Sequence, residues 1–366
     1  MGGINGAAMP KLYKSRGRSL RKMSRDVAIL GCEGIRYISD ADRTLPQQKP
    51  SQWHPASMDK CPPELHAYIC ELTCVDDGHT IRSINKASRY FYNISKPYLY
   101  QNLSISGPKQ IHAIAALLET KPKAYLRYIR HLFISDTTEK HEYSQETDSA
   151  IQATPETHTL ILRIISLAAS TLQSLAFIAY SPQTSTSLIA RLFRISFPRL
   201  RDLTISGFYP FPTTAGKFPR LERLHLNGNR NPHGLLQMSV LENACPSLKF
   251  LKVSGLGSAA SFVKEVKEAM ENSDNKGEES MSLFPAKFPA QVRRVTLQLG
   301  PAPKVVNGGK EQLKDRLMTK YLEDLSIEIA SNLNGAQVVV LDRSPQPTVV
   351  HDIRKEWLDN ITTFIS

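Results

Sequence analysis

Glycine, lysine and histidine residues are the first candidates for chemistry in this chain. The nearest approach to a phosphate-binding loop is Gly308-Gly309-Lys310. However, Lys304 stands where such a loop needs its first glycine, and Glu311 follows the lysine where serine or threonine would hold Mg²⁺. The sequence contains neither a Gly-x-Ser-x-Gly nucleophile elbow nor a His-Glu-x-x-His zinc motif. The sequence therefore predicts a protein that is not an enzyme.

A zinc site can be imagined around Cys70 and Cys74, which lie four residues apart on one predicted helix, with Cys61, His66 and His79 nearby in the sequence. The two paired ligand spacings that structural zinc sites usually have are lacking. Cysteine is also among the most frequently buried residue types, as a small apolar filler. Five cysteines in 366 residues form an odd and low count, as expected for thiols in a reducing compartment. We therefore expect neither a metal nor a cofactor.

Composition and charge limit the kinds of partner. A hydrophobic fraction of 41% supports a folded core, and the net charge of +12 should attract acidic partners. Part of this excess lies in residues 1–58, which we interpret as a basic, mostly disordered segment; a nuclear localisation signal and a phosphate-binding tail remain alternatives. No secretory signal and no apolar run of membrane-spanning length is evident, so we expect an intracellular protein, cytoplasmic or nuclear, without a membrane partner.

The elements that organise the chain lie between Cys61 and Ile105. Pro63 suits a first helical turn, where its missing N–H would be unpaired anyway, and an Asp-Asp-Gly break separates this helix from two further short helices that end at Pro97. Apolar residues recur at spacings of three and four in the first two helices: Leu65, Ile69, Leu72, Ile81 and Ile84. Helices this short hide little surface alone, so we expect their apolar face to have a partner.

These residues resemble a known motif. The run Pro62-Pro63-Glu64-Leu65 and the apolar positions after it are similar to the F-box, and the tail from Lys96 to Ile105 resembles fungal F-box proteins that carry irregular leucine-rich repeats. The resemblance covers about 45 of 366 residues. It implies docking on a Skp-type adaptor and, through it, a cullin scaffold. The implied adaptor-binding residues are Pro62, Pro63, Leu65, Ile69, Leu72, Ile81 and Ile84.

Several positions depart from this family pattern. Cys61, His66 and the pair Asn85-Lys86 stand where the family commonly has apolar residues. A missing leucine side chain at a buried contact costs about 1.5 to 3 kcal/mol. These departures predict weaker adaptor binding.

A second pattern runs through residues 107–334. Apolar residues recur at spacings of three and then two in six sets: Ile129, Leu132, Ile134; Leu172, Leu175, Phe177; Leu200, Leu203, Ile205; Leu221, Leu224, Leu226; Leu248, Leu251, Val253; and Val292, Val295, Leu297. This spacing is the core of a leucine-rich repeat. We therefore predict an α/β solenoid with parallel strands on its concave side and helices, such as 186–195, 235–244 and 259–270, on its convex side.

The remaining segments are less regular. Two polar stretches, at about 136–158 and 272–288, are interpreted as flexible insertions. Residues 312–333 fit either one long helix or a helix followed by a strand near 322–327. Residues 335–366, with a strand at 336–341 and a helix at 352–361, are expected to form a C-terminal cap.

The predicted function is that of a non-catalytic adaptor. Side chains that alternate with the buried ones should line the concave face, where aromatic residues and arginine dominate binding. The expected substrate-binding residues are Phe133, Arg223, His225, Phe250 and Arg294. The leading hypothesis is substrate recognition in a cullin-type ubiquitin ligase. The alternatives are a repeat scaffold without ligase association and, less favoured, a basic nucleic-acid binder.

Overall fold

The computed structural model describes residues 61–76, 78–120, 128–138, 154–180, 182–209, 215–274, 285–303, 309–331, 336–344 and 350–365. They belong to one compact unit, Ser57–Ser366. The predicted basic segment 1–58 lies outside the described residues, as do the central parts of the two predicted insertions.

The described residues begin with short helices: α1 (Pro63–Thr73), α2 (His79–Ala87), α3 (Arg89–Ser95) and the 3₁₀ turn η2 (Lys96–Tyr98). Asp76 starts α2, because its carboxylate accepts hydrogen bonds from the backbone N–H groups of Gly78 and Thr80. Ser88 has an extended backbone between α2 and α3, and its hydroxyl accepts a bond from the Phe91 N–H at 3.2 Å. These caps fix the helix boundaries.

A parallel sheet of eight strands forms the body of this unit, with the strands in sequence order. The strands are β1 (Asn102–Ser106), β2 (His131–Ser135), β3 (Ser174–Ile178), β4 (Asp202–Ser206), β5 (Arg223–Asn227), β6 (Phe250–Leu256), β7 (Arg294–Leu299) and β8 (Gln337–Leu341). The six predicted apolar sets supply β2 to β7, so the α/β class with parallel strands is confirmed. The sequence did not identify β1 as a strand of this sheet.

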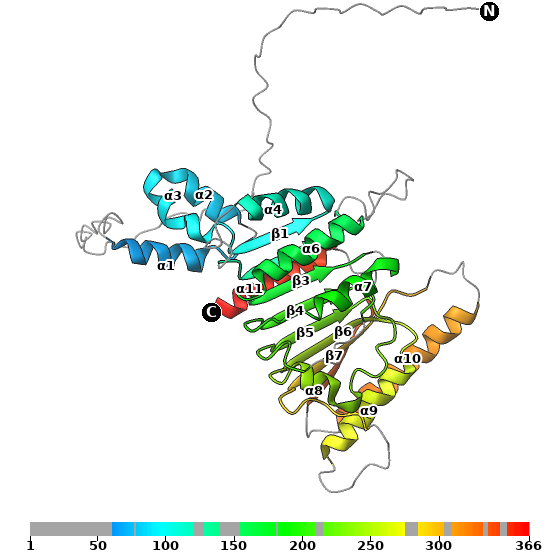
Figure 1. The fold of residues 1–366 in the computed structure, drawn as a ribbon. Coiled ribbons are helices and arrows are strands. Elements are labelled where there is room, and N and C mark those ends of the chain that lie inside the picture. Colours follow the sequence, from blue (N-terminus) through cyan, green and yellow to red (C-terminus); the bar gives the residue numbers. More distant parts are fainter. Residues whose placement is uncertain are drawn as a thin grey trace, which may run out of the picture. The chain divides into compact units, whose positions relative to one another are not determined.

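The register of the sheet places residues of the same kind beside one another on neighbouring strands. The second residue of each strand pairs with the second residue of the next, and this row is apolar throughout: Leu103, Leu132, Leu175, Leu203, Leu224, Leu251, Val295 and Val338. These side chains pack in the main core against the outer helices. Those helices are α4 (Pro108–Thr120), α6 (Pro155–Ala168), α7 (Pro182–Leu192), α8 (Val240–Ala244) with the preceding turn η4 (Gln237–Ser239), α9 (Ala260–Asp274) and α10 (Gly309–Ser331). Figure 1 shows the strands stacked beside one another in sequence order.

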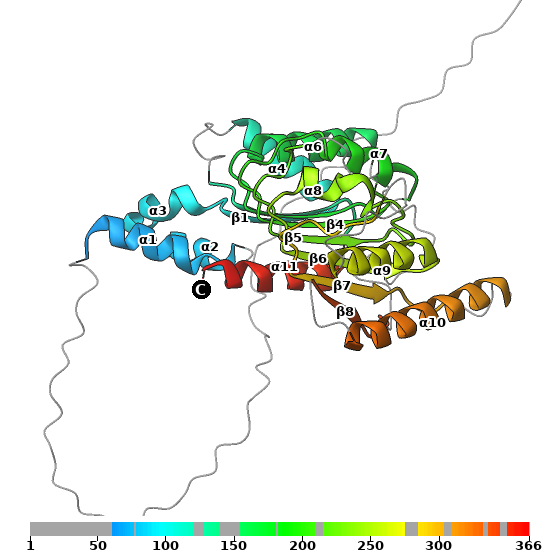
Figure 2. The ribbon, with the colours of Figure 1, turned by 90° about the horizontal axis from the view of Figure 1, so that it is seen from below.

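The last helix, α11 (Val350–Ile365), lies on the opposite, concave face of the sheet. Figure 2 shows α4, α6 and α7 on one side of the strands and α11 on the other. A second core forms there, in which Val350, Ile353, Trp357 and Ile361 pack with side chains of β2 and β3. The helix predicted at 352–361 is confirmed, but it covers the concave face, and β8 continues the sheet. Residues 335–366 therefore do not form a simple terminal cap.

Two further boundaries differ from the prediction. Residues 309–331 form one helix, so the strand considered near 322–327 is wrong. The predicted insertion 136–158 overlaps the start of α6 at Pro155, and the insertion 272–288 overlaps buried core, since Ala286 and Phe288 are 0% and 4% exposed. Both predicted insertions are therefore too long: α6 begins inside the first, and the second includes the end of α9 and a buried segment after it.

The early helices are bonded to the first edge of the sheet. The Asn102 side-chain amide donates to the carbonyl oxygens of Cys74 and Asp76, at 2.6 and 3.1 Å. Glu71 of α1 forms an ion pair with Arg130, which directly precedes β2. We call the elements α1 to η2 the helical module. This module covers the edge of the sheet at β1.

Candidate binding surfaces

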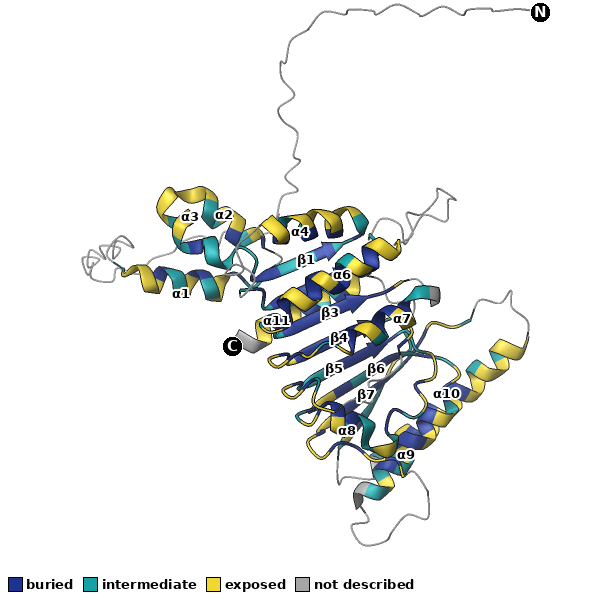
Figure 3. Cartoon of the chain, viewed as in Figure 1, coloured by how far each residue is buried: buried dark blue, intermediate teal, exposed yellow. Residues whose placement is uncertain are grey.

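The outer side of α1 is an exposed apolar surface. Leu65, Ile69 and Leu72 remain 50%, 41% and 38% exposed, and Tyr68 beside them is 56% exposed. Spacings of four and three place the three aliphatic residues on one helix face. Figure 3 shows α1 with exposed residues along much of its length. We call Leu65, Tyr68, Ile69 and Leu72 the α1 stripe. Burying a full aliphatic side chain is worth about 1.5 to 3 kcal/mol, so the stripe is well suited to a partner.

The inner side of α1 carries the residues that made a zinc site conceivable. His66, Cys70 and Cys74 follow one another at spacings of four, and each is at most 3% exposed. His66 Nδ1 lies 2.7 Å from the Tyr90 hydroxyl, and burial raises the pKa of the Cys74 thiol to about 11. Among the described residues, no group of three or more His, Cys, Asp and Glu side chains could hold a metal ion. The two thiols are neutral and pack inside the module.

This geometry shows where two of the family departures, His66 and Asn85, lie. His66 points into the module, so its polarity does not reduce the apolar area of the α1 stripe. Asn85 is also used internally, since its side-chain oxygen accepts a bond from the Ser95 hydroxyl. Ile81, predicted to contact an adaptor, is 1% exposed and therefore belongs to the interior; Ile84 is half-buried. Pro62 and Pro63 are exposed beside the α1 stripe.

The concave face differs most from the prediction. Phe133 is completely buried, with its ring centroid 5.7 Å from that of Trp357 on α11. His225 is 7% exposed; its Nε2 lies 2.7 Å from the Ser254 hydroxyl and its Nδ1 lies 3.6 Å from Glu356 of α11. The expectation that Phe133 and His225 are accessible for substrate is wrong in this structure, because α11 covers them.

Charged groups join the polar side of α11 to the middle of the sheet. Lys252 Nζ donates to Glu356 at 2.7 Å, and Arg223 Nη1 donates to the Thr363 hydroxyl at 3.1 Å. Burial raises the pKa of the Asp202 carboxyl to about 7, although nearby Arg223 opposes this shift. Burial lowers the pKa of His225 to about 4, so its imidazole is neutral at pH 7. The helix is therefore held by an apolar contact at β2 and β3 and a polar contact at β4 to β6.

The part of the concave face toward β7 retains exposed side chains. Phe250 is 38% exposed, and the Arg223 guanidinium lies over its ring at 5.8 Å from the centroid. Arg294, which pairs with Phe250 in the β6–β7 register, is exposed. Of the five expected substrate-binding residues, Phe250 and Arg294 thus lie together on an accessible surface, and Arg223 adjoins them.

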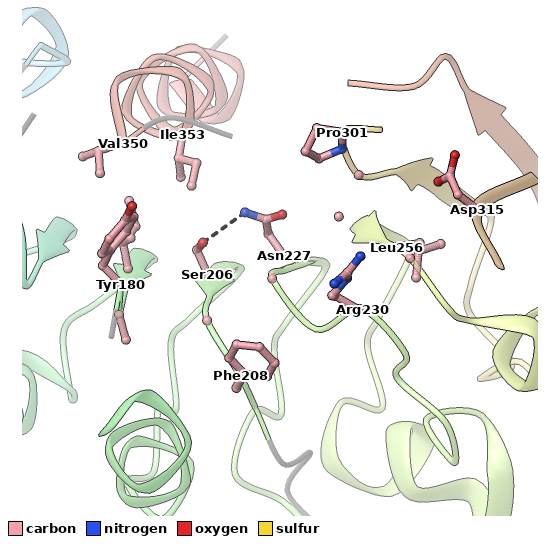
Figure 4. A pocket seen from close by; sticks show the side chains of 17 residues that line it. Tyr180, Ser206, Phe208, Asn227, Arg230, Leu256, Pro301, Asp315, Val350 and Ile353 are labelled. Carbon is pink, nitrogen blue, oxygen red and sulfur yellow. Dashed lines mark hydrogen bonds between the residues drawn. The ribbon is translucent and has the colours of Figure 1, made fainter. Parts of the chain in front are cut away.

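A pocket of about 350 Å³ lies at the carboxyl edge of the sheet, beyond the ends of β3 to β7. In open parallel sheets this edge is where ligands commonly bind. Figure 4 shows Tyr180 and Asp315 at opposite ends of the pocket, with Val350 and Ile353 of α11 on one side and Phe208 on the other. The sequence analysis missed this pocket.

Small residues after the strands leave space for the pocket. Gly228 has a φ of +93°, and a Cβ there would lie 2.9 Å from the backbone nitrogen of Gly207. Asn227 Nδ2 donates to the Ser206 hydroxyl at 3.0 Å, which ties neighbouring strand ends together (Figure 4). The repeated Ser-Gly and Asn-Gly pairs after the apolar sets are the sequence signal that could have indicated such a row.

Two charged side chains face this pocket in different states. Asp315 forms an ion pair with Arg343, whose guanidinium donates to both carboxylate oxygens at 3.0 and 3.1 Å. Arg230 is exposed and has no ion-pair partner within the described ranges. Among the described lining residues, the pocket therefore presents one positive charge without an ion-pair partner.

Comparisons with known proteins add no assignment: no family model matches the chain, and no curated protein or solved structure matches it significantly. Across the described residues, no helix is long and apolar enough to cross a membrane. The segment considered as a phosphate-binding loop lies partly outside the described residues. Its Gly309 and Lys310 are the first residues of α10.

Proposed function

We propose that this chain is a non-catalytic substrate adaptor of a cullin-type ubiquitin ligase, with α1 docking on a Skp-type adaptor and the solenoid holding the substrate. The single observation that carries the proposal is the α1 stripe, whose three aliphatic residues are the ones implied by the F-box resemblance and are 38% to 50% exposed. Holding the substrate close to the conjugating enzyme would raise the effective concentration of the substrate's lysines there and so favour their modification.

The substrate surface in this proposal is the accessible part of the concave face. Phe250 and Arg294 offer an aromatic ring and an exposed guanidinium, the side-chain types that dominate interface energetics. The irregular leucine-rich repeat interpretation is supported by the six apolar sets, which supply consecutive parallel strands with matching register.

The test is co-purification of the full chain with a fungal Skp-type adaptor. Replacing Leu65 and Ile69 together by Asp should abolish the association, because charges would be buried in an apolar contact. The matched control is Leu313→Asp on α10, an apolar residue that is 58% exposed far along the chain. Equal association of the wild type, the double variant and the control would refute adaptor docking through α1.

A scaffold without ligase association is the second candidate. The hydrogen bonds from Asn102 to Cys74 and Asp76 favour this candidate. They attach the early helices to the edge strand β1, so these helices can serve to cover the sheet edge without binding a partner. The same co-purification separates the two candidates, because a pure edge-covering module predicts no association with the adaptor at all.

A further inference from the structure

The pocket at the carboxyl edge of the sheet has the lining of a ligand site. Its volume of about 350 Å³ falls in the range typical of ligand pockets, about 300 to 1,000 Å³. Ile178, Leu256, Val350 and Ile353 supply apolar walls from both faces of the sheet and from α11. Tyr180 and Phe208 are 66% and 42% exposed at its margin, so their rings are accessible to a ligand.

The charge of the pocket selects the kind of ligand. The guanidinium of Arg230 lacks an ion-pair partner in the described parts of the chain, whereas the only carboxylate among the lining residues, Asp315, is already paired with Arg343. A single available guanidinium matches the single charge and planar fork of a carboxylate. The net charge of +12 further favours an acidic ligand.

The local backbone holds Arg230 at this place. The carbonyl of Arg230 accepts a bond from the Gly257 N–H at 3.0 Å. The Arg230 side chain lies across Gly257 so closely that a Cβ there would be 2.8 Å from its Nε atom. Gly257 has no positive φ, so alanine would fit the backbone there and would instead displace the guanidinium.

We propose that this pocket binds a carboxylate carried beside an aromatic or aliphatic residue in a peptide segment of the client protein, with Arg230 pairing with the carboxylate and the apolar walls enclosing its neighbour. The inference rests on the proposed function in one respect: the peptide is assumed to belong to the substrate protein that the adaptor recruits. The carboxylate can come from a chain terminus or from an acidic side chain, because both present the same group.

The experiment is calorimetric titration of the full chain with four synthetic peptides on a common Gly-Ser spacer. One ends in phenylalanine with a free carboxylate, and the second is its C-terminal amide. The third and fourth are amides in which glutamate or glutamine follows the phenylalanine. Binding of the free acid over its amide identifies a chain terminus, and binding of the glutamate peptide over the glutamine peptide identifies a side chain. Either preference supports the proposal.

Substitutions locate the binding. Arg230→Ala should lower the affinity for the preferred peptide at least tenfold, and Gly257→Ala should lower this affinity to a smaller extent. The matched control Arg163→Ala removes an exposed arginine from α6, on the outer face, and should change affinity less than twofold. The proposal is overturned if no peptide binds, if acids and amides bind equally, or if Arg230→Ala and Arg163→Ala have equal effects.

Failure here is distinguishable from failure of the adaptor role. Arg230→Ala should leave co-purification with the Skp-type adaptor unchanged, while the Asp variants of Leu65 and Ile69 should leave peptide binding unchanged. Loss of adaptor docking with intact peptide binding would therefore reject only the ligase role, and the reverse result would reject only the pocket.

Discussion

Helices α1 and α11 carry apolar residues at almost the same spacing, yet in the described part of the chain these residues are exposed on α1 and buried on α11. On α11, Ile353 and Trp357 are each 2% exposed against the concave face. On α1, Leu65 and Ile69 are 50% and 41% exposed. An amphipathic pattern therefore predicts that a helix face will be covered, but it does not identify what covers it.

The inner faces of the two helices differ in the opposite way. The covered side of α1 consists of His66, Cys70 and Cys74, which are small or polar, and its large residues point outward. In α11 the large residues point inward and Glu356 adds a polar contact with Lys252. This distribution indicates that α11 contributes to the stability of the fold, whereas the stripe on α1 contributes little to it.

The largest expected effect follows from breaking the α11 contact. Trp357→Ala should lower the free energy of unfolding by about 3 to 5 kcal/mol, the usual cost of truncating a large buried aromatic side chain. The substitution leaves Phe133, Ala176 and Ile178 facing a cavity. Urea-induced unfolding of the full chain measures the change. A loss below about 1 kcal/mol would show that α11 does not hold its place in solution, since it would match an ordinary surface substitution.

A pH-dependent effect tests the polar half of the same contact. Burial raises the pKa of Asp202 from 3.8 to about 7, so the native state holds a proton there that the unfolded state has lost. The stabilisation from this proton is complete below about pH 4 and is lost as the pH rises through 7. Asp202→Asn lacks the titration and should gain stability relative to the wild type between pH 4 and 8, by at most about 4 kcal/mol.

The measurement is urea-induced unfolding of both proteins at several pH values, with the difference taken at each pH. His225 and His131 also have lowered pKa values, about 4 each, and destabilise the fold as the pH falls below 6.5. Both proteins retain these histidines, so the difference isolates Asp202. A difference that is constant with pH would contradict burial of Asp202 beneath α11.

The strands could be predicted because their signal is local. The spacings of three and two recur in Leu221, Leu224 and Leu226. Leu221 lies just before β5, and Leu224 and Leu226 are the two residues of β5 whose side chains point into the main core. Each set needs only its own residues to be recognised, and the parallel register follows from repetition.

The position of α11 could not be predicted from one segment. It depends on outward residues of five separate strands. Phe133 of β2 and Ala176 and Ile178 of β3 are apolar, while Thr204, His225 and Lys252 of β4 to β6 are polar. Only their assembly in register creates an apolar strip followed by a polar one. The pocket was missed for the same reason, because Arg230 and Asp315 are separated by 85 positions and meet only at the sheet edge.

The smallest expected effect sharpens the comparison between the helices. Ile69→Ala should change the free energy of unfolding by no more than about 1 kcal/mol, because its side chain is already 41% exposed and alanine has the higher helix propensity. The matched control is Ile353→Ala on α11, which makes the same truncation at a residue 2% exposed and should cost about 2 to 5 kcal/mol. Urea-induced unfolding at one pH compares them. Equal losses would mean that the α1 stripe packs against the chain itself in solution, and the surface proposed for a Skp-type adaptor would then be unavailable.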